Sequence, residues 1–132
     1  MNGGNHSFKV EFKKRLYQFV LKIVKLIDAL PSDNVSKRLG DQLLRSSTSI
    51  LANFVEGQAG SSKKDFIRYM EVSLKSANES RLWISLLKDV HRISDGTASS
   101  LQAEANELAN IFGSIVLSAK GKRAPHALRP LS

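Results

Sequence analysis

The sequence contains no cysteine, so it can form neither disulfide bonds nor thiolate metal sites. It also lacks an uninterrupted apolar run of the roughly 20 residues that a membrane-spanning helix needs. The first extended apolar stretch, residues 19–27, is broken by Lys22 and Lys25, which argues against a secretory signal peptide. From these absences we expect a cytoplasmic protein with no membrane partner.

Motifs for catalysis are also missing. The three histidines are scattered along the chain, and neither Glu104 nor Glu107 is followed by the histidine that a di-iron helical bundle requires. The sequence has no glycine-rich phosphate-binding loop followed by Lys-Ser or Lys-Thr, and no serine lies in a nucleophile motif. We therefore predict a protein that is not an enzyme and that uses no metal or cofactor.

What the sequence does contain is positive charge, unevenly distributed. The 132 residues carry a formal net charge of +8, and their 42% hydrophobic content is enough for one domain with a core. Residues 94–119 contain three acidic residues and no Lys or Arg, whereas residues 120–132 contain four basic residues and no acid. This asymmetry indicates that the protein contacts a polyanion, an acidic partner or a charge-matched neighbouring subunit.

Apolar residues recur at steps of three and four in four segments, which predicts four helices. Pro31 ends the first, Ser32 or Asp33 caps the second, and Ser62 with Asp65 forms a capping box for the third. A break at residues 95–96 and a further capping box at residues 99–102 predict the start of the fourth. Short connections favour an all-α, antiparallel up-down-up-down four-helix bundle over residues 8–119. Residues 1–7 are expected to be a disordered N-terminus, and residues 120–132 a basic flexible tail.

Several apolar residues fall outside the stripes that we assign to the core. Phe8 and Val35 are the first residues of the stripes on the first and second helices, and we assign both to the core. Because one bundle leaves residues outside such stripes exposed, they indicate either ordinary surface apolarity or a subunit interface on the second and third helices. The residues outside the stripes are Leu44, Leu51, Val55, Ile67, Leu74 and Leu82.

Polar residues also form a stripe, beside the apolar face of the second helix. Arg45, Ser49, Asn53 and Glu56 lie at steps of four, four and three, which places them on one side of a helix. In an antiparallel pair that turns near residue 60, Arg45 would lie opposite Ser76 and Glu79. We therefore predict a hydrogen-bonded seam in which Arg45 and Glu79 are in contact and at least partly buried; the alternative is a ligand or nucleic-acid pocket.

The same residues carry a family resemblance over roughly residues 8–118. An Arg followed by small residues, Ser-Ile and Asn-x-x-Glu-Gly occurs here as Arg45 to Gly57, followed by Asp65-Phe66 and by Ser76-Ala-Asn-Glu79. This pattern resembles the bacterial four-helix-bundle proteins encoded in intervening sequences of 23S rRNA genes. A related group resembles accessory proteins of diversity-generating retroelements, which partner a reverse transcriptase and bind nucleic acid.

The resemblance implies a ring-forming homo-oligomer, with a homopentamer as the expected form, and no assigned catalysis. The charge pattern adds two hypotheses for function. The first is RNA or DNA binding through basic surfaces; the second is a protein-interaction scaffold or an accessory subunit for a nucleic-acid enzyme such as a reverse transcriptase. The candidate nucleic-acid-binding residues are Lys13, Lys14, Arg15, Lys22, Lys25, Lys120, Lys122, Arg123 and Arg129.

Overall fold

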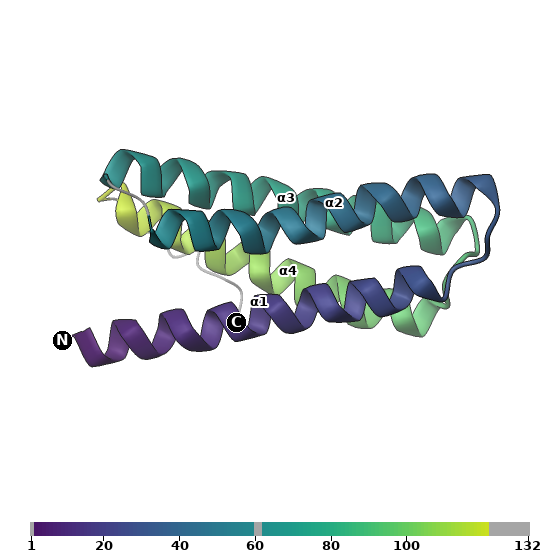
Figure 1. Ribbon diagram of the computed structural model, residues 1–132, viewed down its shortest axis with the longest axis horizontal. Coiled ribbons are helices and arrows are strands. Elements are labelled where there is room, and N and C mark those ends of the chain that lie inside the picture. Colours follow the sequence, from purple (N-terminus) through teal and green to yellow (C-terminus); the bar gives the residue numbers. More distant parts are fainter. Residues whose placement is uncertain (1, 60–61, 122–132) are drawn as a thin grey trace.

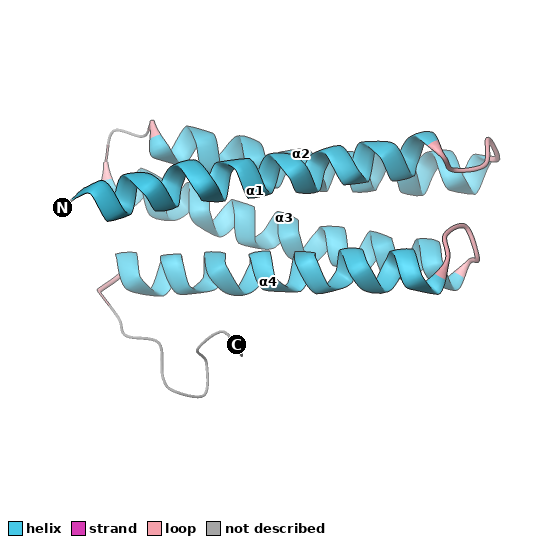
Figure 2. Cartoon of the chain, turned by 90° about the horizontal axis from the view of Figure 1, so that it is seen from below, coloured by secondary structure: helices cyan, strands magenta, loops and turns pink. Residues whose placement is uncertain are grey.

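Four long helices run alternately up and down, as the periodicity predicts. The computed structural model describes residues 2–59 and 62–121. The helices are α1 (Asn2–Asp28), α2 (Asn34–Gln58), α3 (Lys63–Asp89) and α4 (Asp95–Ala119). Figures 1 and 2 show all four lying along one long axis, with α1 connected to α2, and α3 to α4, by turns at the same end of the bundle. The fold is an all-α four-helix bundle.

Side-chain caps set where three of these helices begin. Asp33 accepts a hydrogen bond from the backbone N–H of Ser36, and Ser62 accepts one from that of Asp65, as the sequence predicts. The predicted start of the fourth helix is wrong, because α4 begins four residues before Ser99 and is capped by Ser94. Gly96 lies in the first turn, where a glycine does not stop a helix once Ser94 has satisfied the N–H of Thr97.

The end of α3 depends on a residue in an unusual conformation. His91 has a φ of 62°, a left-handed value that glycine adopts more readily than other residues. Its backbone N–H bonds to the carbonyl of Lys88, and the N–H of Arg92 bonds to that of Leu87 at 2.8 Å. These two bonds form a Schellman motif, which ends the helix and directs the chain toward α4.

Aromatic rings from three helices meet in the core, toward the end of the bundle where α2 ends. Phe12 of α1 lies 5.2 Å from Phe54 of α2 and 5.3 Å from Phe112 of α4, measured between ring centroids. All three side chains are buried, and edge-on or tilted ring contacts of this kind add to the stabilisation from buried apolar area. Most residues of the predicted stripes are buried with them, including Met70, Ile84 and Leu108.

Some positions differ from the expectations. Residues 2–7, expected to be disordered, form the first turns of α1. Phe8 and Val35, assigned to the core, are 46% and 42% exposed because they lie in the first turns of their helices, near the ends of the bundle. Of the predicted tail, Lys120 and Gly121 close the end of α4, while residues 122–132 lie outside the described residues.

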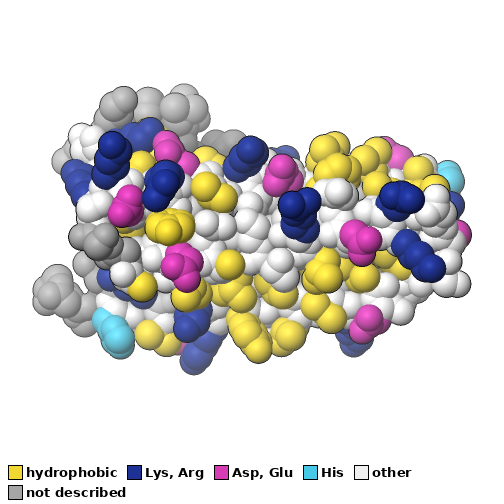
Figure 3. Space-filling view, turned by 45° about the horizontal axis from the view of Figure 1, so that its top comes forward, with side chains coloured by type: hydrophobic (Ala, Val, Ile, Leu, Met, Phe, Trp, Pro, Cys, Tyr) yellow, Lys and Arg dark blue, Asp and Glu magenta, His cyan; other side chains and the backbone are white. Residues whose placement is uncertain are grey.

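Apolar side chains at the surface are more widely distributed than predicted. Leu44, Val55 and Leu82 are exposed, as expected for residues outside the core stripes, whereas Leu51, Ile67 and Leu74 are half-buried against the core. Helix α1 adds exposed apolar residues that the sequence analysis did not single out: Val10, Tyr17, Leu21 and Val24. In the space-filling view, hydrophobic side chains reach the surface in patches between the charged ones (Figure 3).

Candidate nucleic-acid interface

The seam between α2 and α3 is built from serine hydroxyls. Ser46 and Ser80 share a hydrogen bond of 2.8 Å, and Ser73 donates to the carbonyl of Ile50 across the same boundary at 2.9 Å. Ser76 donates to Ser49 at 2.8 Å, and Asn53 donates to both the carbonyl and the hydroxyl of Ser49. Small side chains of this kind let two helices approach closely while satisfying their own polar groups.

A hydrogen-bonded seam therefore exists, but it consists of neutral side chains, and the charged residues predicted to belong to it lie outside it. The predicted contact between Arg45 and Glu79 is wrong within one chain: both side chains are exposed, and no described hydrogen bond or ion pair joins them. In the observed register Ser46 lies opposite Ser80. Arg45 and Glu79 each come one residue earlier in the chain than this buried pair, and their side chains point to solvent. Glu56 is exposed as well.

Glycine completes the same boundary near its end. A Cβ atom at Gly57 would lie 3.1 Å from the Cβ of Tyr69 and closer still to the Cε of Met70. Because a side chain at this point would crowd Tyr69 and Met70, the glycine of the Asn-x-x-Glu-Gly pattern has a steric role; it does not end the helix, which continues to Gln58. The serines of the seam and Gly57 thus hold α2 and α3 together.

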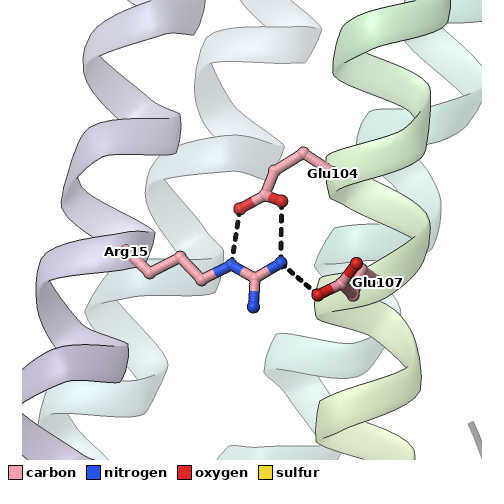
Figure 4. A network of polar contacts seen from close by, with 3 residues as sticks. All are labelled: Arg15, Glu104 and Glu107. Carbon is pink, nitrogen blue, oxygen red and sulfur yellow. Dashed lines mark hydrogen bonds and ion pairs between the residues drawn. The ribbon is translucent and has the colours of Figure 1, made fainter. Parts of the chain in front are cut away.

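The first and last helices are joined by a charged clamp. The guanidinium of Arg15 donates two parallel hydrogen bonds to the carboxylate of Glu104, each of 2.8 Å, and a third of 2.6 Å to Glu107 (Figure 4). These hydrogen bonds raise the pKa of Arg15, and the bond from Arg15 lowers the pKa of Glu104. The two glutamates, noted in the sequence only for the histidine that they lack, belong to this clamp.

The clamp changes the set of basic residues that are free to bind a polyanion. Arg15 is a sequence-predicted candidate, but two carboxylates of α4 already neutralise it. Lys13, Lys22 and Lys25 are exposed, and none of them is paired with an acidic side chain among residues 2–59 and 62–121. Lys14 lies 3.6 Å from Glu11 in a contact open to solvent, which is worth little.

The candidates at the other end of the chain are only partly visible. Lys120 forms an ion pair of 2.9 Å with Glu71 of α3, so its charge is partly compensated. Lys122, Arg123 and Arg129 lie outside the described residues. The described part of the candidate interface is therefore α1, whose lysines surround the Arg15 clamp.

Two further properties bear on the class of protein. No described helix is both long and apolar enough to cross a membrane. Among the described residues, no group of three or more histidines or acidic side chains could hold a metal ion.

The antiparallel arrangement of four long helices places the chain among the all-α bundle proteins. Within that class, it belongs to the 23S rRNA-intervening sequence protein family, which its sequence matches over residues 9–114. Among solved structures it is similar to a protein of unknown function from the S23 ribosomal protein family of Bacteroides thetaiotaomicron, with 32% sequence identity and a TM-score of 0.74. That similarity covers 79% of this chain and 96% of the other. No curated protein matches the sequence.

Proposed function

We propose that this protein is a non-enzymatic, oligomeric, cytoplasmic protein that binds RNA through the basic face of α1. The observation that carries the proposal is the division of charge across the α1–α4 boundary. Arg15 forms ion pairs with both Glu104 and Glu107, and these are the acids of α4 beyond its first turn. The lysines of α1 are consequently left to face solvent.

Helical geometry gathers part of this charge on one side. At about 100° per residue, Lys14, Lys22 and Lys25 fall within about a quarter turn of one another, on the side of α1 that carries Arg15. Ammonium groups arranged along a helix suit the phosphate backbone and read no bases. Binding should therefore be indifferent to sequence and should weaken steeply as salt rises.

Assembly would multiply this modest charge. Exposed apolar residues on three helices, among them Leu21, Leu44 and Leu82, support an interface between copies of the chain. A ring of five subunits would present the α1 lysines five times, and such multivalency raises avidity without new contacts. Light scattering after size exclusion should give a mass near five times 14.6 kDa, and a monomer at micromolar concentration would exclude the ring.

A matched pair of variants tests the RNA surface. Lys14→Glu with Lys25→Glu reverses two charges of this face, and Lys37→Glu with Lys75→Glu makes the same change in net charge at exposed positions on α2 and α3. Fluorescence anisotropy with a labelled single-stranded RNA should show a loss of at least tenfold in affinity for the first variant and a much smaller loss for the second. Equal losses would mean that only net charge matters and would refute a surface on α1.

Truncation after Ala119 tests the contribution of residues 120–132, which carry Lys120, Lys122, Arg123 and Arg129. If this segment binds RNA, its removal should lower the affinity and flatten the dependence on salt, while the oligomer keeps its size. If these bases instead pair with α4 of a neighbouring subunit, RNA binding stays the same and the oligomer loosens.

A second candidate function is a protein-interaction scaffold, or an accessory subunit of a nucleic-acid enzyme such as a reverse transcriptase. The observation that favours it is the exposed Val10, Tyr17, Leu21 and Val24 on α1, because apolar residues on the basic helix itself suit a protein partner better than a phosphate backbone. Strong RNA binding that persists in high salt would favour neither reading, whereas weak RNA binding at low salt would favour the scaffold.

A further inference from the structure

A hollow lies between the last turns of α1 and the first turns of α4, and neither the seam nor the clamp accounts for it. Its volume is about 610 Å³, within the range of small-molecule sites. Lys22, Lys25 and Leu26 line it from α1, Leu30 from the turn after α1, Arg92 from the turn after α3, and Leu101 from α4. The side chains of the two helices therefore border a solvent-open hollow here that they do not fill.

Three cationic side chains line this space, and no acidic one does. Lys22 and Lys25 are exposed and form no described ion pair, while Arg92 is held in place by Asp33 at 3.4 Å and by the carbonyl of Val90 at 2.6 Å. Of the nearby acids, Glu104 binds Arg15, whereas Asp33 caps α2 and also partly compensates the charge of Arg92, which leaves the two lysines uncompensated by a described ion pair. Positive charge is thus concentrated around the hollow.

The rest of the lining is divided between hydroxyl and aliphatic groups. Ser94, Thr97 and Ser100 supply hydroxyls from the start of α4, and Ser94 and Thr97 already bond to each other at 2.9 Å. Leu26, Leu30 and Leu101 supply an apolar wall, and none of the lining residues is aromatic. A nucleic-acid base would find no ring to stack on, whereas an aliphatic group would find a surface that matches it.

We propose that this hollow binds a small phosphate monoester with a compact apolar body. A phosphate monoester carries a charge of nearly −2 at neutral pH, which three cations and neighbouring hydroxyls suit better than they suit a monoanion. The apolar wall gives the remainder of the molecule a place to leave water. The hollow shares Lys22 and Lys25 with the proposed RNA surface, whereas Lys14 does not line it.

Gly96 offers a direct test, because it lines the hollow and a Cβ atom there would meet nothing within 4 Å. Gly96→Glu would bring a carboxylate to the site in the first turn of α4, where the helix dipole favours an acid and the fold should tolerate it. Gly113→Glu is the matched control: it makes the same change on the same helix, also in open space, outside the lining.

The experiment is isothermal titration of n-hexyl phosphate at low ionic strength into the full-length protein and both variants, with circular dichroism to verify folding. We expect Gly96→Glu to weaken binding about tenfold, as a like charge near the phosphate should, and Gly113→Glu to stay within twofold of the parent. The double variant Lys22→Gln with Lys25→Gln should weaken binding similarly if Gly96→Glu does not fold.

Further probes define the ligand class. Inorganic phosphate tests the head without the body, n-hexanol the body without the phosphate, and hexanoate a monoanionic head; each should bind more weakly than n-hexyl phosphate. No measurable binding of n-hexyl phosphate, equal effects of the two glycine variants, or equal affinity for inorganic phosphate would overturn the proposal. The proposal would also be overturned if n-hexyl phosphate failed to bind and Gly96→Glu weakened the binding of a single-stranded RNA, because the hollow would then be a nucleic-acid site.

Discussion

Two boundaries of the bundle, α2–α3 and α1–α4, are held together in opposite ways. Between α2 and α3, buried serines exchange neutral hydrogen bonds, and Ser73 and Ser80 are fully excluded from solvent. Between α1 and α4, the polar contact is a charged clamp whose Arg15 side chain is 33% exposed, and one end of the boundary is hollow. One boundary is closed and the other is partly open.

Side-chain size explains the contrast. Serine and glycine at the α2–α3 boundary let the helices approach until main-chain carbonyls accept hydrogen bonds from the opposite helix. Lysine, arginine and glutamate flank the α1–α4 boundary, and such long charged chains extend to water and cannot be buried without partners. The closed boundary is suited to stability, and the open one is where a ligand or a polyanion can reach the protein.

The largest effect is expected where the closed boundary is forced apart. Ser73→Leu removes the bond to the carbonyl of Ile50 and places a side chain with two more heavy atoms in a filled contact. We expect the free energy of unfolding to fall by about 3 kcal/mol, at the upper end for overpacked cores. Thr48→Leu, at an exposed position on α2, is the control and should change it by less than about 0.5 kcal/mol.

Denaturant unfolding at one fixed protein concentration measures both variants, since assembly would make stability depend on concentration. Equal, small effects of Ser73→Leu and Thr48→Leu would show that the α2–α3 boundary is not closely packed.

A smaller effect is expected at the open boundary. Arg15→Leu leaves two carboxylates of α4 without their cation, but water can solvate them, so we expect a loss of about 1–2 kcal/mol in the free energy of unfolding. Lys14→Leu, next to it and solvent-exposed, should cost less than about 0.5 kcal/mol. In a double-mutant cycle with Glu104→Gln, strict additivity would mean that the clamp contributes nothing to stability.

The clamp also predicts a dependence on pH. Hydrogen bonding to Arg15 holds the pKa of Glu104 below its ordinary value of 4.5, so the folded state binds this proton less readily than the unfolded state. The stabilisation is therefore fully present above pH 4.5 and is lost as the pH falls through the lower folded pKa. The stability difference between the parent and Arg15→Leu should shrink below pH 4.5.

Asp33 is a second carboxylate with a lowered pKa, and the same titration distinguishes it from Glu104. Its bonds to the backbone and hydroxyl of Ser36 lower its pKa to about 2, so its contribution should persist to more acidic pH. A parent and an Arg15→Leu variant that lose stability in parallel between pH 5 and 3 would contradict the assignment to Glu104.

The smallest effect is expected from removing one hydroxyl of the closed boundary. Ser46→Ala deletes the bond to Ser80, but Ser80 keeps its own bond to the carbonyl of Ser76, so no buried group loses every partner. The free energy of unfolding should fall by about 1 kcal/mol or less. Ser80→Ala should behave alike, and a loss several times larger from either would mean that the hydroxyl chain acts as a cooperative network.

Local features of the fold could be predicted from the sequence because each depends on residues close together in the chain. The four helical stripes, Asp33 as a cap and the Ser62–Asp65 capping box need only the period of the helix and the chemistry of its first turn. The start of α4 was misplaced because Gly96 resembles a breaker, although a glycine in the first turn does not prevent the helix. The seam between α2 and α3 was predicted, but not which of its residues are buried.

The sequence by itself determined four helices, their antiparallel order and the polar edge of α2. The tertiary structure decided which polar residues meet, because that depends on the register between helices, and a shift of one residue turns a side chain by about 100°. Arg45 therefore faces solvent while Ser46 is buried, and Arg15 finds Glu104 although 89 positions separate them. The hollow beside Lys22 and Lys25 likewise exists only because α1 and α4 pack together with Arg92 between their ends.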